Sequence, residues 1–162
     1  MAGMIELILP DAESTDLLGR ALAQTRPATA VVHLQGDLGA GKSTLARALL
    51  RALGVQGAIR SPTYTLIERY PLPSGEAWHL DLYRIGTAGE LDFLGLDEGS
   101  ADLWLVEWPE RGEGGLPPVD LVIALEIAGN GRRARLQAHS ATAEAWLGQL
   151  REMSDLQALP VS

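Results

Sequence analysis

The sequence predicts an α/β fold with a central mixed sheet flanked by helices. Short apolar segments of strand length alternate with longer segments of helical periodicity, which is typical of this class. A glycine-rich segment joins one predicted strand directly to a predicted helix. The chain has 162 residues, 46% of them hydrophobic and 21% charged, which suits one packed domain. We expect residues 1–152 to form that domain and residues 153–162 to be a frayed tail.

The start of the chain is expected to form a strand, a helix and a second strand. Ile5–Leu9 is apolar and suits an edge strand. Ser14 or Thr15 is the expected cap of an amphipathic helix that stops before Pro27. Ala30–Leu34 is apolar and partly β-branched, which predicts a buried strand.

The middle of the chain predicts a helix, two strands and a short acidic helix. Behind the glycine-rich segment, leucines recur at every fourth position over Leu45–Leu53, and Gly54 lies where a left-handed cap is expected. Tyr64–Tyr70 alternates apolar and polar residues, as a half-exposed strand does. A turn then leads to a second strand over Trp78–Tyr83, and Ala88–Leu94 follows as the acidic helix.

The last third predicts a buried strand, a hairpin and a final helix. Leu103–Val106 is wholly apolar and short, which favours a buried strand. Val119–Ile127 and Arg132–His139 flank Gly129–Gly131, whose Asn-Gly pair favours a tight hairpin turn. A helix around Trp146 completes the domain.

The glycine-rich segment matches the P-loop motif G-x-x-x-x-G-K-[ST], and its position between a strand and a helix is the one that this motif requires. Its glycines let the backbone approach phosphate closely, and its amides and the helix N-terminus point at the anion. The sequence therefore predicts a nucleotide site with a magnesium ion. The expected contacts along the loop are Gly36, Asp37, Leu38, Gly39, Ala40, Gly41, Lys42, Ser43 and Thr44.

Lysine usage supports this prediction. Of the 13 basic residues, 12 are arginines, and the single lysine is Lys42 inside the loop. An ammonium group acts there as a point charge against the outer phosphates, a role that the guanidinium fork fills poorly. The hydroxyl group of Ser43 is the expected protein ligand of magnesium.

A magnesium nucleotide site also needs carboxylates, which usually follow a buried strand near the loop. Glu107 directly follows Leu103–Val106, and Asp81 lies within Trp78–Tyr83. We expect both to bind the metal or to orient water, although each residue type is also common at exposed strand ends. Which of the two performs which task is left open. The predicted catalytic set is thus Lys42, Asp81 and Glu107.

Four further residues have two interpretations each. Thr63 follows Pro62 and is expected either to sense the terminal phosphate through magnesium or to begin a strand after a fixed turn. Trp108 either stacks on the base or packs. Arg132, together with Arg133 and Arg135, has two interpretations. These arginines either contact the nucleotide or a partner, or they form a solvated strand face. His79 is interpreted as structural or partner-facing. No N-K-x-D motif is present, which favours ATP over GTP.

Composition excludes several classes of function. The chain has no cysteine, so disulfides, zinc–thiolate sites and thiol nucleophiles are absent. Its net charge is −8, which argues against strong direct binding to RNA or DNA. No apolar stretch is long enough to span a bilayer, and no basic segment precedes the first apolar run, so we expect a cytoplasmic protein.

Four segments in this order closely resemble the bacterial TsaE (YjeE) family, the ATPase subunit of tRNA threonylcarbamoyladenosine biosynthesis. The resemblance extends from about Leu9 to about Ala138. The segments are the glycine-rich loop, Ser61-Pro62-Thr63-Tyr64-Thr65-Leu66, His79-Leu80-Asp81-Leu82-Tyr83-Arg84 and Val106-Glu107-Trp108-Pro109-Glu110.

The resemblance implies a small cytoplasmic ATPase that is weak alone and works with two partners, TsaB and TsaD. Those partners transfer a threonylcarbamoyl group to the adenosine beside the anticodon, and they make most of the contact with tRNA. The resemblance also implies roles for single residues. Lys42 and Ser43 would hold phosphate and magnesium, and Glu107 would belong to the magnesium site. Asp81 would lie in the catalytic centre, and Gly131 would be near the nucleotide.

Two other functions are considered. A small-molecule kinase would use Asp81 to deprotonate an acceptor hydroxyl, but residues 85–100 contain no arginine or lysine for a closing lid. A non-catalytic scaffold would use ATP binding alone to order Ser61–Tyr70 for a partner.

Overall fold

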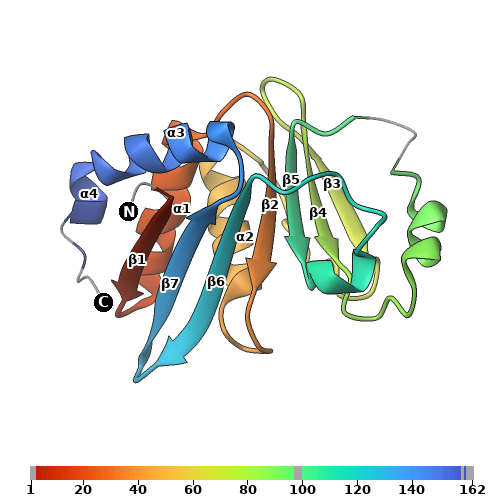
Figure 1. The fold of residues 1–162 in the computed structure, drawn as a ribbon, viewed down its shortest axis with the longest axis horizontal. Helices are drawn as coiled ribbons and strands as arrows, with labels where there is room; N and C mark the ends of the chain where they lie inside the picture. The colour runs from red at the N-terminus through yellow and green to blue at the C-terminus, as the bar shows by residue number, and fades with distance from the viewer. Residues whose placement is uncertain (1–2, 97–99, 158, 160–162) are drawn as a thin grey trace.

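The computed structural model describes residues 3–96, 100–157 and 159, and it confirms the predicted α/β fold with a mixed sheet. Seven strands are arranged in the order β1-β7-β6-β2-β5-β4-β3 (Figure 1). The strands β6, β2, β5 and β4 run parallel to one another, whereas β1, β7 and β3 join antiparallel. The strands are β1 (Met4–Leu9), β2 (Ala30–Gln35), β3 (Ile67–Pro71), β4 (Glu76–Asp81), β5 (Leu103–Glu107), β6 (Leu121–Ala128) and β7 (Gly131–Ala138).

The helices α1, α2 and α3 share one hydrophobic core with the sheet. Leu18 of α1, Leu49 of α2 and Trp146 of α3 are almost completely buried in it. Gly19 of α1 approaches α2 so closely that an added Cβ atom would lie 2.7 Å from the Cβ atom of Ala48. The helices are α1 (Ala12–Thr25), α2 (Lys42–Ala52), α3 (Ala141–Arg151) and α4 (Ser154–Gln157), with 3-10 turns η1 (Ala88–Leu94) and η2 (Pro109–Gly112).

The cap of α1 differs from the prediction. Asp11 is the N-cap, and its carboxylate accepts hydrogen bonds from the Ser14 amide at 2.9 Å and the Ser14 hydroxyl at 2.7 Å. These bonds lower the pKa of Asp11. Ser14 and Thr15 are instead buried inside the first turns. Aspartate and serine are comparable caps, so the sequence alone does not distinguish them.

The opposite face of β4 and β5 carries a second, smaller core around Trp78, Leu80 and Val106. This core explains an error in the predicted strand Tyr64–Tyr70, because β3 begins only at Ile67. Before it, the chain turns back, with a hydrogen bond of 2.7 Å from the Leu66 amide to the Pro62 carbonyl and a positive φ of 70° at Leu66. Leu66 packs against the second core from a turn, so its apolar character does not indicate a strand.

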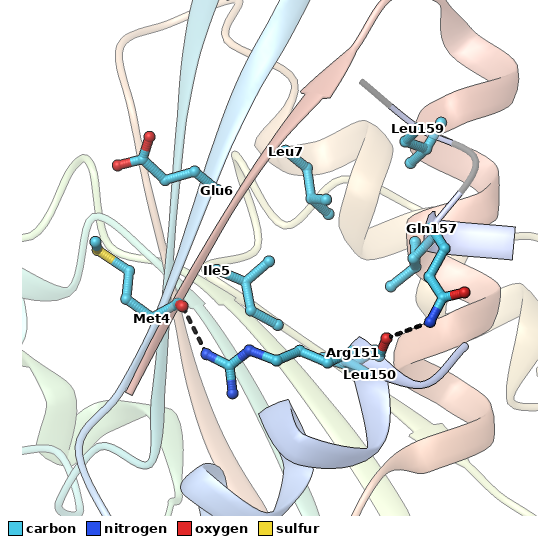
Figure 2. Close-up of a pocket in the computed structure, with 9 residues that line it drawn as sticks. Met4, Ile5, Glu6, Leu7, Leu150, Arg151, Gln157 and Leu159 are labelled. Carbon is cyan, nitrogen blue, oxygen red and sulfur yellow. Dashed lines mark hydrogen bonds between the residues drawn. The ribbon is translucent and has the colours of Figure 1, made fainter. Parts of the chain in front are cut away.

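Part of the carboxyl-terminal segment packs against the main core. Ser154–Gln157 forms α4, and Leu156 and Leu159 are buried. Figure 2 shows Leu159 and Leu7 at an apolar cavity of about 330 Å³ between β1 and the carboxyl-terminal helices. Burial of Leu156 and Leu159 favours a fixed position for these two residues. The frayed tail stays a prediction, and residues 158 and 160–162 lie outside the described residues.

Candidate nucleotide-binding site

Three parallel strands end together beside the glycine-rich loop. Glu107 is in register with Leu34 of β2 on one side and with Asp81 of β4 on the other. Two residues after Leu34, the chain enters the loop at Gly36. Figure 1 shows β2, β5 and β4 running in the same direction toward this edge. The carboxyl edge of a parallel sheet is where α/β proteins bind ligands.

A cavity of about 350 Å³ opens at this edge. It brings together most of the residues that the sequence singles out, from the loop, from the ends of β4 and β5 and from the start of β7. It is lined by Asp37, Leu38, Gly39, Gly41, Lys42, Ser43, Thr44, Thr63, Asp81, Tyr83, Glu107, Trp108 and Arg132. The apolar cavity of Figure 2 contains none of these residues.

Three predicted contact residues do not line this cavity. An added Cβ atom on Gly36 would lie 2.4 Å from the carbonyl oxygen of Leu125, so this position tolerates only glycine. Ala40 is buried in the main core. Gly131 lines a neighbouring cavity, and a Cβ atom there would lie 2.4 Å from the carbonyl oxygen of Leu9. Packing against β1 therefore explains the glycine at 131 without any ligand.

The loop leaves the start of α2 free to meet an anion. Gly41 is the N-cap, with a left-handed φ of 106°, and no side chain caps the helix. The first turn of α2 holds no acidic residue. The unpaired amides and the positive end of the helix dipole therefore face the cavity that Ser43 and Thr44 line.

The Lys42 side chain is buried and folded over the loop. Its Nζ atom donates hydrogen bonds to the carbonyl oxygens of Gly36 and Asp37 and lies 4.2 Å from the ring centre of Trp108. Burial lowers the pKa of Lys42, and the nearby carboxylates, Glu107 foremost, oppose that shift. Two carbonyl groups and an aromatic face are weak partners for an ammonium group compared with phosphate oxygens. Lys42 is thus a cation available to an anionic ligand.

Glu107 connects the loop to the sheet. The Ser43 hydroxyl group donates to the Glu107 carboxylate, with both oxygens 3.2 Å away. On its other side, Oε2 of Glu107 lies 2.6 Å from Nε2 of His79, and both side chains are buried. Sequence reasoning did not identify the contact with His79. The alternation of β4, which puts residues 79 and 81 on the same side, was the signal that could have shown it.

Asp81 is buried beside Glu107 but has different partners. Its Oδ1 atom accepts from the Tyr83 amide at 3.1 Å, and its Oδ2 atom accepts from the Thr63 hydroxyl at 3.4 Å. Thr63 in turn lies 2.7 Å from the Ser61 hydroxyl. Asp81 therefore links the turn that contains Thr63 to the acidic side of the cavity.

Trp108 has a left-handed backbone with φ of 56°, which is uncommon for a residue with a side chain. Its ring lies between Lys42 and the Tyr83 ring, whose centre is 4.9 Å away. Tyr83 lines the cavity, and sequence reasoning missed it. The aromatic side chain at 108 thus contacts the loop cation directly, in addition to lining the cavity.

The three arginines at the start of β7 have different surroundings. Arg132 donates from Nε to the Ala40 carbonyl at 3.0 Å and from Nη2 to the Gly39 carbonyl at 3.2 Å, so it clamps the loop. Arg133 and Arg135 form ion pairs with Glu126 and Glu6 on neighbouring strands. These two belong to the solvated strand face that was one of the two interpretations.

The donor set suits magnesium bound partly by phosphate and water. Within residues 3–96, 100–157 and 159, no group of three or more histidine, cysteine, aspartate or glutamate residues forms a cage for a metal ion. A hydroxyl and carboxylates, Ser43, Glu107 and Asp81, line the same cavity. Magnesium is usually held by one or two carboxylates together with substrate phosphates, so the residues present fit it.

The fold and site define an α/β protein that carries the P-loop motif at the carboxyl edge of its parallel strands. None of the helices among the described residues is long and apolar enough to cross a membrane.

Comparison with known proteins identifies the family. Residues 9–135 match the model of threonylcarbamoyl adenosine biosynthesis protein TsaE, so the chain belongs to the TsaE family. It is 40% identical over 112 residues to the tRNA threonylcarbamoyladenosine biosynthesis protein TsaE of Haemophilus influenzae, covering 68% of this chain and 71% of that protein. It is 38% identical over 130 residues to that of Aquifex aeolicus, covering 79% and 91%.

A solved structure agrees with this family. The crystal structure of Bacillus subtilis YdiB superposes with a TM-score of 0.77 at 28% sequence identity, covering 91% of this chain and 94% of the other. The predicted family and fold are both confirmed.

Proposed function

We propose that this chain binds ATP with magnesium at the glycine-rich loop and hydrolyses it as the ATPase subunit of tRNA threonylcarbamoyladenosine biosynthesis. Family membership supports the pathway, since the related proteins carry that name. One observation carries the nucleotide assignment. A buried lysine, a free helix start and two aligned carboxylates line a single cavity.

Each side chain in the cavity has a task that its contacts support. Lys42 exchanges its two loop carbonyls for the outer phosphate oxygens. The Ser43 hydroxyl oxygen would bind the metal, and Glu107, which accepts from that hydroxyl group, would hold the metal's water ligands. Magnesium would offset the negative charge of the phosphates during phosphoryl transfer.

Asp81 is assigned to the attacking water. It lies one strand further from Ser43 than Glu107 does, and it already accepts a hydrogen bond from Thr63. A carboxylate next to the turn of Thr63 is suited to orient a water molecule beyond the terminal phosphate. Thr63 would sense the terminal phosphate, and the conformation of the surrounding segment would depend on that contact.

Hydrolysis by the chain alone is expected to be weak. Arg132 is the arginine that lines the cavity, and its guanidinium group is occupied with the carbonyls of Gly39 and Ala40. Stabilisation of the transferring phosphoryl group by an arginine is worth several orders of magnitude in rate. We therefore propose that partners of the TsaB and TsaD type raise the rate.

The net charge of the chain supports the same assignment of tasks to this chain and to its partners. A net charge of −8 suits contact with protein partners better than contact with tRNA phosphates. Contact with tRNA is thus assigned mainly to the partners, and the proposed compartment is the cytoplasm, where tRNA is modified.

Single-turnover phosphate release tests this function. Purified chain is mixed with radiolabelled ATP and magnesium, alone and with the two partners. Slow release that the partners accelerate supports the proposal. ATP that binds but stays intact even with both partners would indicate a nucleotide-dependent scaffold instead.

A further inference from the structure

A buried imidazole supports the acidic side of the cavity. His79 is 2% exposed and lies on β4, and its Nε2 atom is 2.6 Å from Oε2 of Glu107 on the next strand. A carboxylate can only accept in this bond, so Nε2 carries the hydrogen. The Nδ1 atom of His79 is also buried and has no hydrogen-bond partner among the described residues. The bond to Glu107 is therefore the one hydrogen bond of this ring among the described residues.

The contacts of Glu107 explain why such support is needed. In the ligand-free chain, the carboxylate is held from one side by Ser43 and from the other by His79. A hydroxyl binds a metal ion through an oxygen lone pair, so Ser43 can still donate to Glu107, but its 3.2 Å distance to both carboxylate oxygens does not fix which of them faces the metal. The terminal torsion of a glutamate is broad, so a carboxylate without a second partner rotates freely.

We propose that His79 is a positioning residue for the magnesium site, an inference that rests on the proposed function. Its Nε2–H group fixes Oε2 of Glu107 and thereby directs Oε1 toward the metal and its water ligands. Groups that orient a metal-binding carboxylate in this way usually change metal affinity about 10-fold to 100-fold when they are removed.

Two substitutions separate positioning from packing. In His79→Gln the amide nitrogen lies about where Nε2 lies, whereas in His79→Asn it lies about where Nδ1 lies. We measure the magnesium concentration that gives half-maximal ATP hydrolysis, and the dissociation constant for ATP without metal in EDTA. His139→Asn, a change at an exposed histidine away from the cavity, is the control.

For His79→Asn we expect the half-saturating magnesium concentration to rise about 10-fold to 100-fold, with metal-free ATP affinity unchanged. His79→Gln is expected to remain within about 3-fold of the wild type, as is His139→Asn, because each keeps a donor on Glu107. Equal effects of Gln and Asn, or an unchanged magnesium requirement in folded His79→Asn, would overturn the role.

A spectroscopic measurement on the wild type does not depend on variants that fold. The chain contains three histidines, so nitrogen-15 spectra of their rings are simple to assign. We expect the His79 ring to carry a hydrogen on Nε2, and we expect its signals to move in Glu107→Gln. A His79 ring with its hydrogen on Nδ1 alone would refute the proposal. Wild-type chain that binds no nucleotide with magnesium would refute the proposed function, and the ring measurement would still report on the contact.

Discussion

The cavity has two walls that are built in different ways. The loop wall, residues 36–43, is held by its backbone: Gly36 fits against Leu125, and Arg132 clamps the carbonyls that follow. The acidic wall, Asp81 and Glu107, is held by side-chain hydrogen bonds that come from three different segments. The torsions of the loop wall are thus set by its own glycines and its clamp comes from β7, whereas the acidic wall depends on the register of β4 and β5. Substitutions in the loop wall and in the acidic wall should therefore have different effects on the protein.

The largest effect is expected on the loop wall. Lys42→Ala removes the loop's only ammonium group, and ATP affinity should fall by more than about 100-fold, equivalent to about 3 kcal/mol for bonds to charged phosphate oxygens. Calorimetry with ATP and magnesium measures this loss. The fold should persist, because the buried ammonium makes no ion pair with a carboxylate among the described residues. Retention of wild-type affinity would show that the loop does not bind phosphate.

On the acidic wall, Glu107→Gln should reduce turnover and not ATP binding. The amide keeps the shape of the side chain but loses the charge that faces the metal, and we expect hydrolysis to slow about 100-fold. Steady-state hydrolysis with both partners present is the measurement, and metal-free ATP affinity is the control. A variant that hydrolyses ATP at the wild-type rate would remove Glu107 from the metal site.

Asp81→Asn should have a smaller effect than Glu107→Gln. Asn keeps one acceptor oxygen for the Tyr83 amide, and its NH2 group can donate to the Thr63 hydroxyl, so the main loss is the negative charge that orients water. We expect about a 10-fold loss of turnover, below the roughly 100-fold to 10,000-fold that general acid–base catalysis contributes, because a neutral side chain of the same shape remains in place. An unchanged magnesium requirement in this variant would distinguish its role from that of Glu107. The opposite ranking of the two variants would reverse the assignment of their tasks.

Gly131→Ala should affect stability and leave nucleotide binding unchanged. The new methyl group would press on Leu9 and Pro10, and overpacking of this kind costs about 1 to 3 kcal/mol. Chemical denaturation measures this cost, and calorimetry on the folded variant measures ATP affinity. Loss of affinity without loss of stability would restore the nucleotide contact that the family resemblance implies for Gly131.

The same contrast determines how much the sequence could predict. The P-loop motif predicts the loop wall because the glycines of the motif act through local torsions and close contacts, as at Gly36 and Gly41. The two acids could be predicted from their places at strand ends. The partner of Glu107 was harder to predict: the alternation of β4 puts His79 on the same side as Asp81, but its contact with Glu107 also depends on the pairing of β4 with β5.

Elsewhere, what the sequence could not predict also arises from tertiary contacts. In the sequence, Leu66 looks like part of an alternating strand, but in the structure it lies in a turn and packs against the second core. Leu156 and Leu159 look like residues of a loose end, but the main core extends to include them. At Leu66 the apolar signal was correct about packing and wrong about the local conformation.

The most direct test is calorimetric titration of the wild type and of Lys42→Ala with ATP, with and without magnesium. Binding to the wild type that magnesium strengthens, together with its loss in Lys42→Ala, is the predicted result. Well-folded wild-type chain that takes up no ATP with magnesium, even beside TsaB and TsaD type partners, would contradict a nucleotide site at this loop.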